Sequence, residues 1–150
     1  MRYPTDGSTP RPPRPRCCVV RDARPSDADA IAELIVALGY EVSATEVRRR
    51  LKGVSALVAE KGKVVGALTT AVTAVLHRPR PVGRISMMVV AEAARGGGIG
   101  AAMVAEAEKR LKAAGCGLVE VTSNRKRLRA HAFYERLGYE RTSYRFAKPL

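Results

Sequence analysis

The stretch Arg95-Gly96-Gly97-Gly98-Ile99-Gly100 decides how this chain is expected to fold. It follows an apolar run that ends at Val90 and precedes an amphipathic segment that extends to about Ala114. A strand, a glycine-rich turn and a helix N-terminus in this order bring several backbone N–H groups together, and the helix dipole adds about half a positive charge. Glycines have no Cβ, so a phosphate can approach the backbone closely. The sequence therefore predicts an anion site, with the Arg95 guanidinium beside it.

Two common phosphate-binding patterns do not match this turn. The chain contains no GxxxxGK[ST] segment, which excludes a Walker A loop. A GxGxxG dinucleotide motif would need a third glycine where Ala101 or Met103 stands, and only 50 residues follow Gly100, too few for a doubly wound domain. The pattern that does match is R-x-x-G-x-G, formed by Arg95, Gly98 and Gly100.

Hydrophobic periodicity on both sides of the turn predicts a mixed α/β domain. The expected strands cover about 18–21, 56–60, 64–76, 84–90, 118–122 and 139–146, and the expected helices cover about 26–38, 43–52, 98–114 and 127–137. Ser26, and either Ser43 or Thr45, are the expected N-caps of the first two helices. The third helix should bury a face of residues at four-residue steps and carry two ion pairs on its exposed side: Ile99, Met103, Ala107 and Leu111 on the face, with Glu106/Arg110 and Glu108/Lys112 as the pairs.

Length and composition indicate one globular domain. A chain of 150 residues suits a single domain, and 46% hydrophobic residues exclude a wholly disordered chain. Residues 1–16 contain five prolines and are interpreted as a flexible tail, which leaves 17–150 as the domain. No apolar run could span a membrane, and no secretory signal is recognisable. Three cysteines favour reduced thiols in the cytoplasm, and two histidines without a CxxC motif argue against a metal site.

The charge balance indicates an anionic partner without naming it. The formal net charge is +13, and basic residues cluster at 48–52 and 124–129. The absence of Trp and of a recognisable reader motif disfavours nucleic-acid binding, which is kept as a minor alternative. Such a charge repels polycations over long range, which favours small, neutral or acidic acceptors.

Two motifs, in this succession of elements, resemble the GNAT superfamily of N-acetyltransferases. Residues 90–100 resemble that superfamily's acyl-CoA motif, and residues 130–139 resemble its C-terminal motif, Ala-His-Ala-Phe-Tyr-Glu-Arg-Leu-Gly-Tyr in this chain. The segment 21–31 looks like its first strand and helix, and the resemblance covers residues 18–150. It implies a mixed, mostly antiparallel sheet flanked by helices. It also implies that the strand ending near Val90 and the strand ending near Thr122 splay apart.

The resemblance further implies acetyl-CoA as co-substrate and direct transfer of its acetyl group to a primary amine in a ternary complex. Backbone groups of Met88, Val89 and Val90 are then expected to bind the pantetheine arm, and an amide near Val90 to polarise the thioester carbonyl. The pyrophosphate is expected on the turn, at Arg95, Gly96, Gly97, Gly98, Ile99, Gly100 and Ala101. Tyr134 is expected to protonate the departing CoA thiolate, with Asn124 and Arg127 as further cofactor contacts. A homodimer is expected by analogy.

The general base and the acceptor stay open at this stage. Many relatives carry an acidic residue where Ser86 and Met87 stand here, so a water chain, Glu120, Glu41 or His131 are the alternatives. The acceptor could be an aminoglycoside-like amine, a polyamine, an amino acid, or a protein lysine or N-terminus, with Tyr40 and Glu41 at its rim. The missing carboxylate also leaves a non-catalytic acyl-CoA-binding module as an alternative function.

Overall fold

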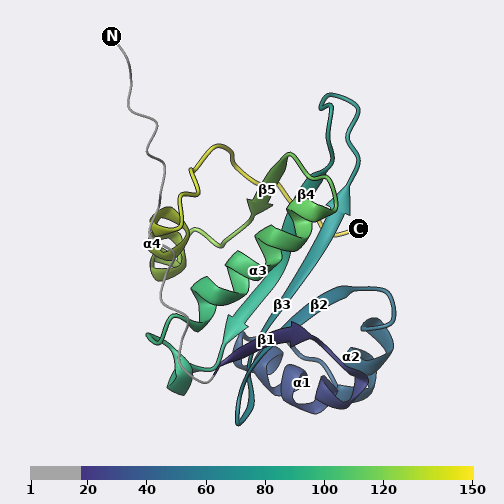
Figure 1. The fold of residues 1–150 in the computed structure, drawn as a ribbon, viewed down its shortest axis with the longest axis vertical. Coiled ribbons are helices and arrows are strands. Elements are labelled where there is room, and N and C mark those ends of the chain that lie inside the picture. The colour runs from purple at the N-terminus through teal and green to yellow at the C-terminus, as the bar shows by residue number, and fades with distance from the viewer. Residues whose placement is uncertain (1–17) are drawn as a thin grey trace.

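A five-stranded sheet runs through the computed structural model, which describes residues 18–150 (Figure 1). The proposed tail lies outside the described residues. The strand order is the chain order, β1 (Val19–Asp22), β2 (Ser55–Lys61), β3 (Lys63–Thr73), β4 (Val82–Val90) and β5 (Leu118–Val121). Strands β1 to β4 are antiparallel, and β5 lies parallel to β4. The predicted mixed, mostly antiparallel sheet is confirmed.

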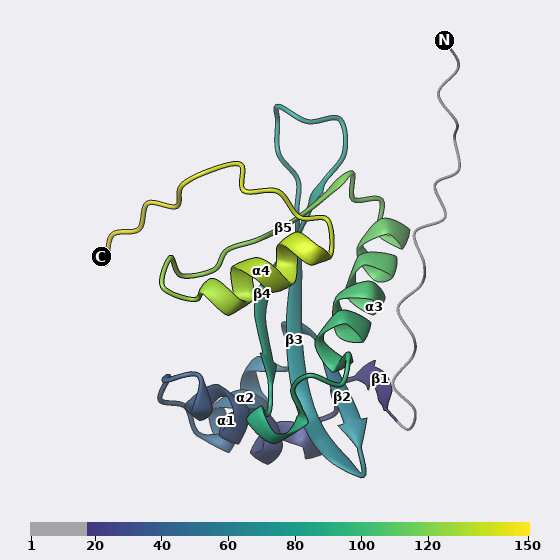
Figure 2. The same ribbon diagram turned by 90° about the vertical axis from the view of Figure 1, so that its left-hand side faces the viewer.

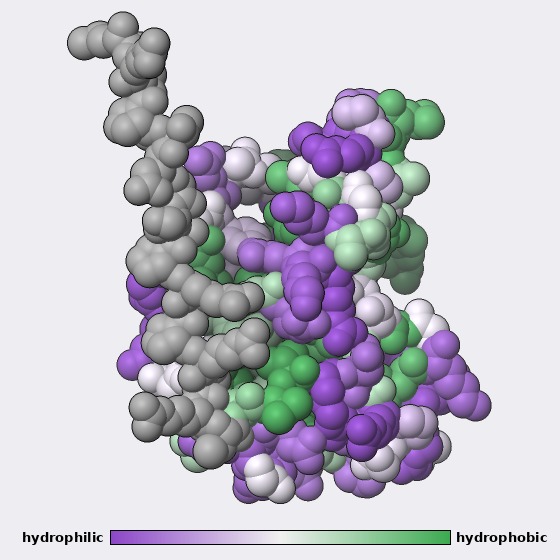
Figure 3. All heavy atoms as spheres, in the orientation of Figure 1, coloured by the Kyte–Doolittle hydropathy of each residue, from purple (hydrophilic) through white to green (hydrophobic). Residues whose placement is uncertain are grey.

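Helices cover the two faces of the sheet unequally. Helices α1 (Ala28–Ala37) and α2 (Ala44–Arg50) cover the lower part of one face, and α3 (Ile99–Ala113) crosses the other face (Figures 1 and 2). Helix α4 (Leu128–Arg136) lies beside β4 and β5, and short 3-10 turns occupy Pro25–Asp27 and Glu92–Ala94. Hydrophilic residues gather across the middle of the α3 side (Figure 3). None of the helices within 18–150 has the length and apolar character needed to cross a membrane.

Helix α3 buries the face that the four-residue spacing predicts. Ile99, Met103, Ala107 and Leu111 are all buried, and the core on this side also contains Leu68 and Ile85 from the sheet. Leu111 packs directly on β4, because a Cβ added to Gly83 would lie 2.9 Å from its methyl carbons. Burying one such side chain stabilises the fold by about 2 kcal/mol.

The starts of the first two helices depend on different residues. Ser43 accepts a hydrogen bond from the Glu46 N–H, and the Glu46 carboxylate accepts one from the Ser43 N–H, so Ser43 is the N-cap of α2. Ser26 is not the cap of the first helix. Instead the buried Asp27 carboxylate accepts hydrogen bonds from the Arg24 N–H and from the Arg21 guanidinium, which lowers the pKa of Asp27.

Strands β4 and β5 separate partway along β4. Their pairing runs only from Val82 opposite Leu118 to Ile85 opposite Val121, whereas β4 continues to Val90. The ladder with β3 is interrupted at the same level: Thr70 faces Ile85 and Thr69 faces Met87, which leaves Ser86 as a bulge. A bulge increases the local twist of a strand. The expected splay is therefore confirmed, with its apex at Ser86.

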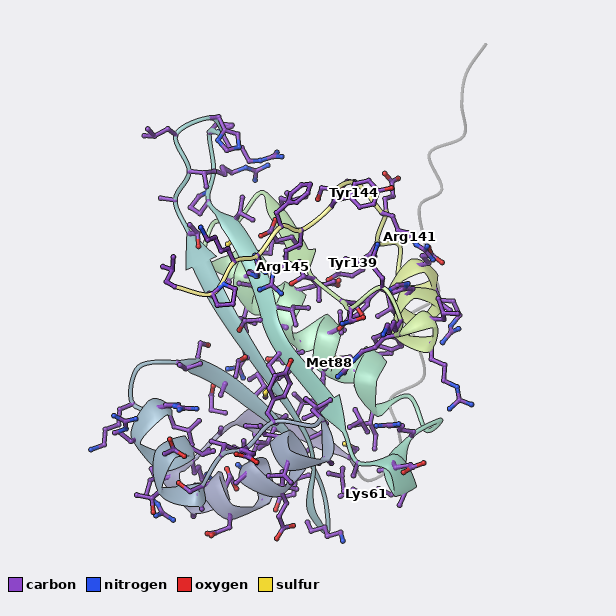
Figure 4. The ribbon with its side chains drawn as sticks, turned by 180° about the vertical axis from the view of Figure 1, so that it is seen from behind. Lys61, Met88, Tyr139, Arg141, Tyr144 and Arg145 are labelled. Atoms are coloured by element: carbon purple, nitrogen blue, oxygen red, sulfur yellow. The ribbon has the colours of Figure 1, made fainter. Side chains whose placement is uncertain are left out.

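The expected strand at 139–146 is wrong. Within the part of the chain that the structure describes, no strand follows β5, and the segment after α4 runs unpaired on the side of the sheet away from α3 (Figures 2 and 4). Tyr144 and Phe146 are 86% and 94% exposed. Aromatic residues favour strands only where they pack against neighbours, and nothing here supplies that packing. Likewise, β3 ends at Thr73 rather than near Leu76.

Candidate active site

The open edge of β4 carries backbone groups of two residues that no neighbouring strand pairs. The Ala91 N–H donates to the Val65 carbonyl of β3 at 2.7 Å. Because neighbouring residues of an antiparallel strand point their N–H and C=O groups to opposite sides, Val89 also faces β3, while Met88 and Val90 face the open edge. Val89 is buried in the core beneath α1. The edge could therefore bind an extended ligand through Met88 and Val90, whereas the backbone groups of Val89 point toward β3.

The glycine turn, residues 95–101, leads from the end of this edge into α3. Gly96 and Gly98 have φ values of +81° and +78°, a left-handed conformation that favours glycine. Gly98 is the N-cap of α3 and has no side chain to bind the first N–H groups, and no acidic residue lies in the first turn. Those N–H groups and the helix dipole are thus available to an anion.

Arg95 and Gly100 have structural roles within this turn. The Arg95 Nε donates to the Val90 carbonyl at 3.1 Å, so the exposed guanidinium is held against the end of the open edge. A Cβ on Gly100 would lie 3.2 Å from the Phe133 ring, so its missing side chain makes room for α4. The sequence motifs did not indicate this contact, because Phe133 lies on a helix 33 residues further along the chain.

Tyr134 lies in the core between the sheet and α4. Its side chain is 9% exposed, and its ring meets Phe133 and Tyr139 edge to face, with ring centroids 5.1 Å and 5.6 Å away. Burial raises the pKa of the Tyr134 phenol, so the hydroxyl stays protonated at neutral pH and can act as a proton donor. Among residues 18–150 its hydroxyl group has no hydrogen-bond partner, which leaves the proton available to a bound molecule.

The start of α4 is held by hydrogen bonds that involve Asn124, Arg127 and His131. The Asn124 side-chain oxygen accepts from the Lys126 N–H at 2.9 Å, and the Asn124 carbonyl lies 2.9 Å from His131 Nε2. The buried Nδ1 of His131 has no partner in the described part of the chain. Arg127 turns toward α1, where its guanidinium donates to the Leu38 carbonyl at 3.4 Å. The structure thus engages Asn124 in a turn and Arg127 in a contact with the end of α1.

None of the candidate bases stands free at the apex of the splay. The Ser86 and Thr69 hydroxyl groups are 2.8 Å apart and hydrogen-bonded to each other. The Glu120 carboxylate forms an ion pair with Arg84 at 3.2 Å, and the same guanidinium donates to Thr122 Oγ1 at 2.8 Å. Glu41 and Tyr40 are exposed in the link between α1 and α2.

A hollow next to the apex was not predicted from the sequence. It has a volume of about 300 Å³ and lies where β4 and β5 are still paired, lined by Thr73, His77, Arg78, Val82, Arg84 and Glu120 among others. Its residues come from three strands and a loop that are far apart in the chain. One sequence feature could have indicated the hollow: polar Arg84 and Glu120 alternate with apolar neighbours that face α3. Within residues 18–150 no group of three potential metal ligands is found.

A comparison with sequence models of protein families identifies the family of this chain. The sequence model of the Acetyltransferase (GNAT) family matches residues 27–139. No match was found among curated protein sequences. Among solved structures, a protein of Agrobacterium tumefaciens str. C58 assigned as an acetyltransferase is 29% identical, with a TM-score of 0.78 over 88% of this chain and 99% of that one.

Two further structures are similar in fold. A transcriptional regulator from Bacillus halodurans C-125 is 24% identical, with a TM-score of 0.79 over 89% of this chain and 99% of that one. An aminoglycoside acetyltransferase from an uncultured soil metagenomic sample is 18% identical, with a TM-score of 0.75 over 89% of this chain and 97% of that one. At these identities the likeness concerns the fold alone.

Proposed function

Because the chain belongs to the GNAT acetyltransferase family, we propose that it transfers the acetyl group of acetyl-CoA to a primary amine by direct transfer in a ternary complex. The observation that carries this proposal is the open edge of β4, which ends at the glycine turn. A strand edge and a helix N-terminus in continuous sequence suit a ligand that has both an amide-containing arm and phosphates.

The glycine turn and the open edge together fit the two halves of the cofactor. The N–H groups at the start of α3 would bind the pyrophosphate, with Gly97 open to its approach. The N–H and C=O groups of Met88 and the N–H group of Val90 would bind the pantetheine arm, since the Val90 carbonyl already accepts from Arg95. The edge from Ser86 to Val90 is about 13 Å long at 3.3 Å per residue, which suits an extended arm. We place the reactive end near the apex of the splay.

The chain's own residues would act on the reaction as follows. The Met88 N–H, which is the edge group nearer to the apex, would polarise the acetyl carbonyl, so that the carbon accepts the amine. The acceptor ammonium loses a proton to water, because Ser86 and Met87 stand where a carboxylate would be needed. Tyr134 donates its phenolic proton as the carbon–sulfur bond breaks, so the leaving thiolate departs as a thiol. Bound acetyl-CoA supplies the activated acyl group.

The contacts of Asn124 and Arg127 favour roles other than cofactor binding. Arg127 bridges α4 to the end of α1, which suits a wall of the acceptor site rather than a phosphate contact. Asn124 shapes the turn before α4. The buried thiol of Cys116 is compatible with the cytoplasmic location that we propose for this reaction.

The test removes one hydroxyl group from the proposed acid. Tyr134→Phe keeps the ring in the core, so the fold and the affinity for acetyl-CoA should persist, while kcat should fall about 100-fold or more because general acid catalysis contributes that much. The matched control is Tyr144→Phe, which removes the same group from an exposed ring. The measurements are thiol release with a panel of amines and calorimetric titration with acetyl-CoA.

Two results would contradict the proposal. Full activity of Tyr134→Phe would exclude Tyr134 as the acid. Acetyl-CoA binding by the unaltered chain without turnover on any amine would instead support the alternative, a non-catalytic acyl-CoA-binding module, for which the missing strand carboxylate is the only argument.

A further inference from the structure

We infer that the acceptor amine carries an anionic group, a carboxylate or a phosphate, and that the hollow beside the apex of the splay binds it. This inference rests on the proposed acetyl transfer and names the substrate class for that site. It is carried by the position of the hollow, by its arginine side chains and by the pairing of its one acidic residue.

The position of the hollow suits an acceptor. Arg84 and Glu120 face each other across β4 and β5, one residue before the last pair of that ladder, Ile85 and Val121. Both side chains belong to the face of the sheet away from α3, since Gly83 and Ile85 face α3 instead. The hollow of about 300 Å³ therefore borders the apex from the side opposite the helix. It is large enough for part of a small molecule.

The charges of the hollow favour an anion. Arg78 and Arg84 line it, and a smaller adjoining hollow of about 150 Å³ adds Arg80 to Arg78. Glu120 is the opposing charge, and its carboxylate is already paired with Arg84. Among residues 18–150 no carboxylate pairs with Arg78. The Arg84 guanidinium is engaged by Glu120 and Thr122, so Arg78 and Arg80 supply the guanidinium groups that can receive a ligand. A guanidinium binds carboxylates and phosphates through two parallel hydrogen bonds, so these two side chains suit either group.

The surroundings of the hollow disfavour a second ammonium group. The segment after α4 crosses the same side of the sheet and brings Arg145 with it (Figure 4). The whole chain carries a formal charge of +13. A polyamine or an aminoglycoside would bring extra positive charges into this field, whereas an acceptor with one amine and one anionic group would be attracted.

The separation along β4 sets the length of the acceptor. Arg84 precedes Ser86 by two residues, which is about 7 Å along a strand. An amine at the apex and an anionic group in the hollow, at the level of Arg84, should therefore be separated by several carbon atoms. We expect 6-aminohexanoate to fit better than glycine, whose two groups are too close together.

The experiment compares acceptors that differ only at the far end. Acetyl transfer is measured for 6-aminohexanoate, 6-aminohexyl phosphate, hexylamine and 1,6-diaminohexane, with glycine as the short acceptor. We expect kcat/KM to be at least tenfold higher for one or both anionic acceptors than for hexylamine and 1,6-diaminohexane. The carboxylate and the phosphate form separate arms, so the better of the two identifies the group.

Variants of the hollow then locate the preference. Arg78→Gln and Arg80→Gln should raise KM for the anionic acceptor about tenfold and leave KM for hexylamine unchanged. Arg49→Gln, on the exposed side of α2 and far from the hollow in sequence and fold, is the matched control and should change neither. Arg78→Glu should shift the preference toward 1,6-diaminohexane.

The outcomes separate the inference from the proposed function. If hexylamine is acetylated as well as the anionic acceptors, or if the variants change all acceptors equally, the inference is overturned while acetyl transfer stands. If acetyl-CoA binds and no anionic acceptor reacts, the inference is again overturned. If acetyl-CoA does not raise the thermal unfolding midpoint at all, the proposed function fails, and the inference fails with it.

Discussion

Single glycines in the turn before α3 lack side chains for different physical reasons. Gly98 has a φ of +78°, so a Cβ there would strain the backbone, although space is available. Gly100 has an ordinary φ, but a Cβ would press on the Phe133 ring at 3.2 Å. Gly97 has neither constraint, because the nearest atom to an added Cβ would be the Ala94 carbonyl oxygen at 3.9 Å. Gly97 is therefore the glycine at which an added methyl group tests the approach of an anion without straining the backbone or pressing on a neighbour.

Substitution of these glycines should separate stability from binding. Gly97→Ala should leave the free energy of unfolding within about 0.5 kcal/mol of the original chain and should raise the Kd for acetyl-CoA about tenfold or more, because the methyl group occupies the approach to the backbone. Gly98→Ala should lower the free energy of unfolding by about 1–2 kcal/mol. Urea unfolding and calorimetric titration measure the two effects. Undiminished affinity in Gly97→Ala would mean that the phosphates bind elsewhere.

The Tyr139 hydroxyl ties the end of α4 to α3. It donates to Glu108 Oε1 at 2.8 Å, so Glu108 does not form the ion pair with Lys112 that the sequence predicted. Burial, together with this hydrogen bond, raises the pKa of the Tyr139 phenol above its ordinary value, and burial alone raises that of Tyr134. In the unfolded chain both phenols ionise near pH 10.

The decrease in the free energy of unfolding at alkaline pH should therefore depend on the ionisation of these two phenols. Their neutral forms stabilise the fold fully below about pH 10, and this contribution is lost as the pH rises further, because the unfolded chain then releases protons that the folded chain retains. Tyr139→Phe should lower the free energy of unfolding at pH 8 by about 1 kcal/mol and flatten its decline above pH 10. Urea unfolding between pH 8 and 11 measures this, and Tyr144→Phe should follow the original curve.

At the scale of elements, hydrophobic periodicity predicted the features that depend on residues close together in the chain, such as the buried face of a helix. The face of α3 was predictable because Ile99, Met103, Ala107 and Leu111 repeat at helical spacing. The side to which each backbone group of β4 points was not, because an apolar run from Ile85 to Val90 contains no sign of the bulge at Ser86. For that reason the sequence did not indicate that the backbone groups of Val89 point toward β3. The hollow was not predicted because residues of three separate strands line it. The sequence of one strand alone does not determine how that strand pairs with the others.

The segment after α4 marks the limit of β-propensity. Tyr144, Phe146 and their neighbours favour a strand in isolation, but β5 remains an edge with one partner. Phe146→Ser should therefore change the free energy of unfolding by less than about 0.5 kcal/mol. Leu111→Ala, the buried counterpart on α3, should lower it by about 2–5 kcal/mol. Urea unfolding compares them, and a large loss for Phe146→Ser would show that the segment packs in solution.

At the scale of the whole molecule, the charge of +13 suits any polyanion, so charge alone does not distinguish acetyl-CoA from a nucleic acid. The two differ in what they require of the fold. Nucleic-acid binding through surface arginines depends on many phosphate contacts and weakens steeply with salt. Acetyl-CoA would bind to one strand edge and one helix N-terminus, where backbone N–H groups supply much of the contact and fewer counterions are released.

Thermal unfolding with each ligand decides between them. Acetyl-CoA at 100 times its Kd should add about 2.7 kcal/mol, which raises the unfolding midpoint of a domain of this size by about 5–10 °C. Most of that shift should persist from 50 to 200 mM salt, whereas any shift caused by a short DNA duplex should largely disappear over the same range. NADPH, which also carries phosphates, is the control and should cause a smaller shift. A shift with the duplex that persists in salt, without one for acetyl-CoA, would assign the basic surface to nucleic acid and leave the edge of β4 without its proposed ligand.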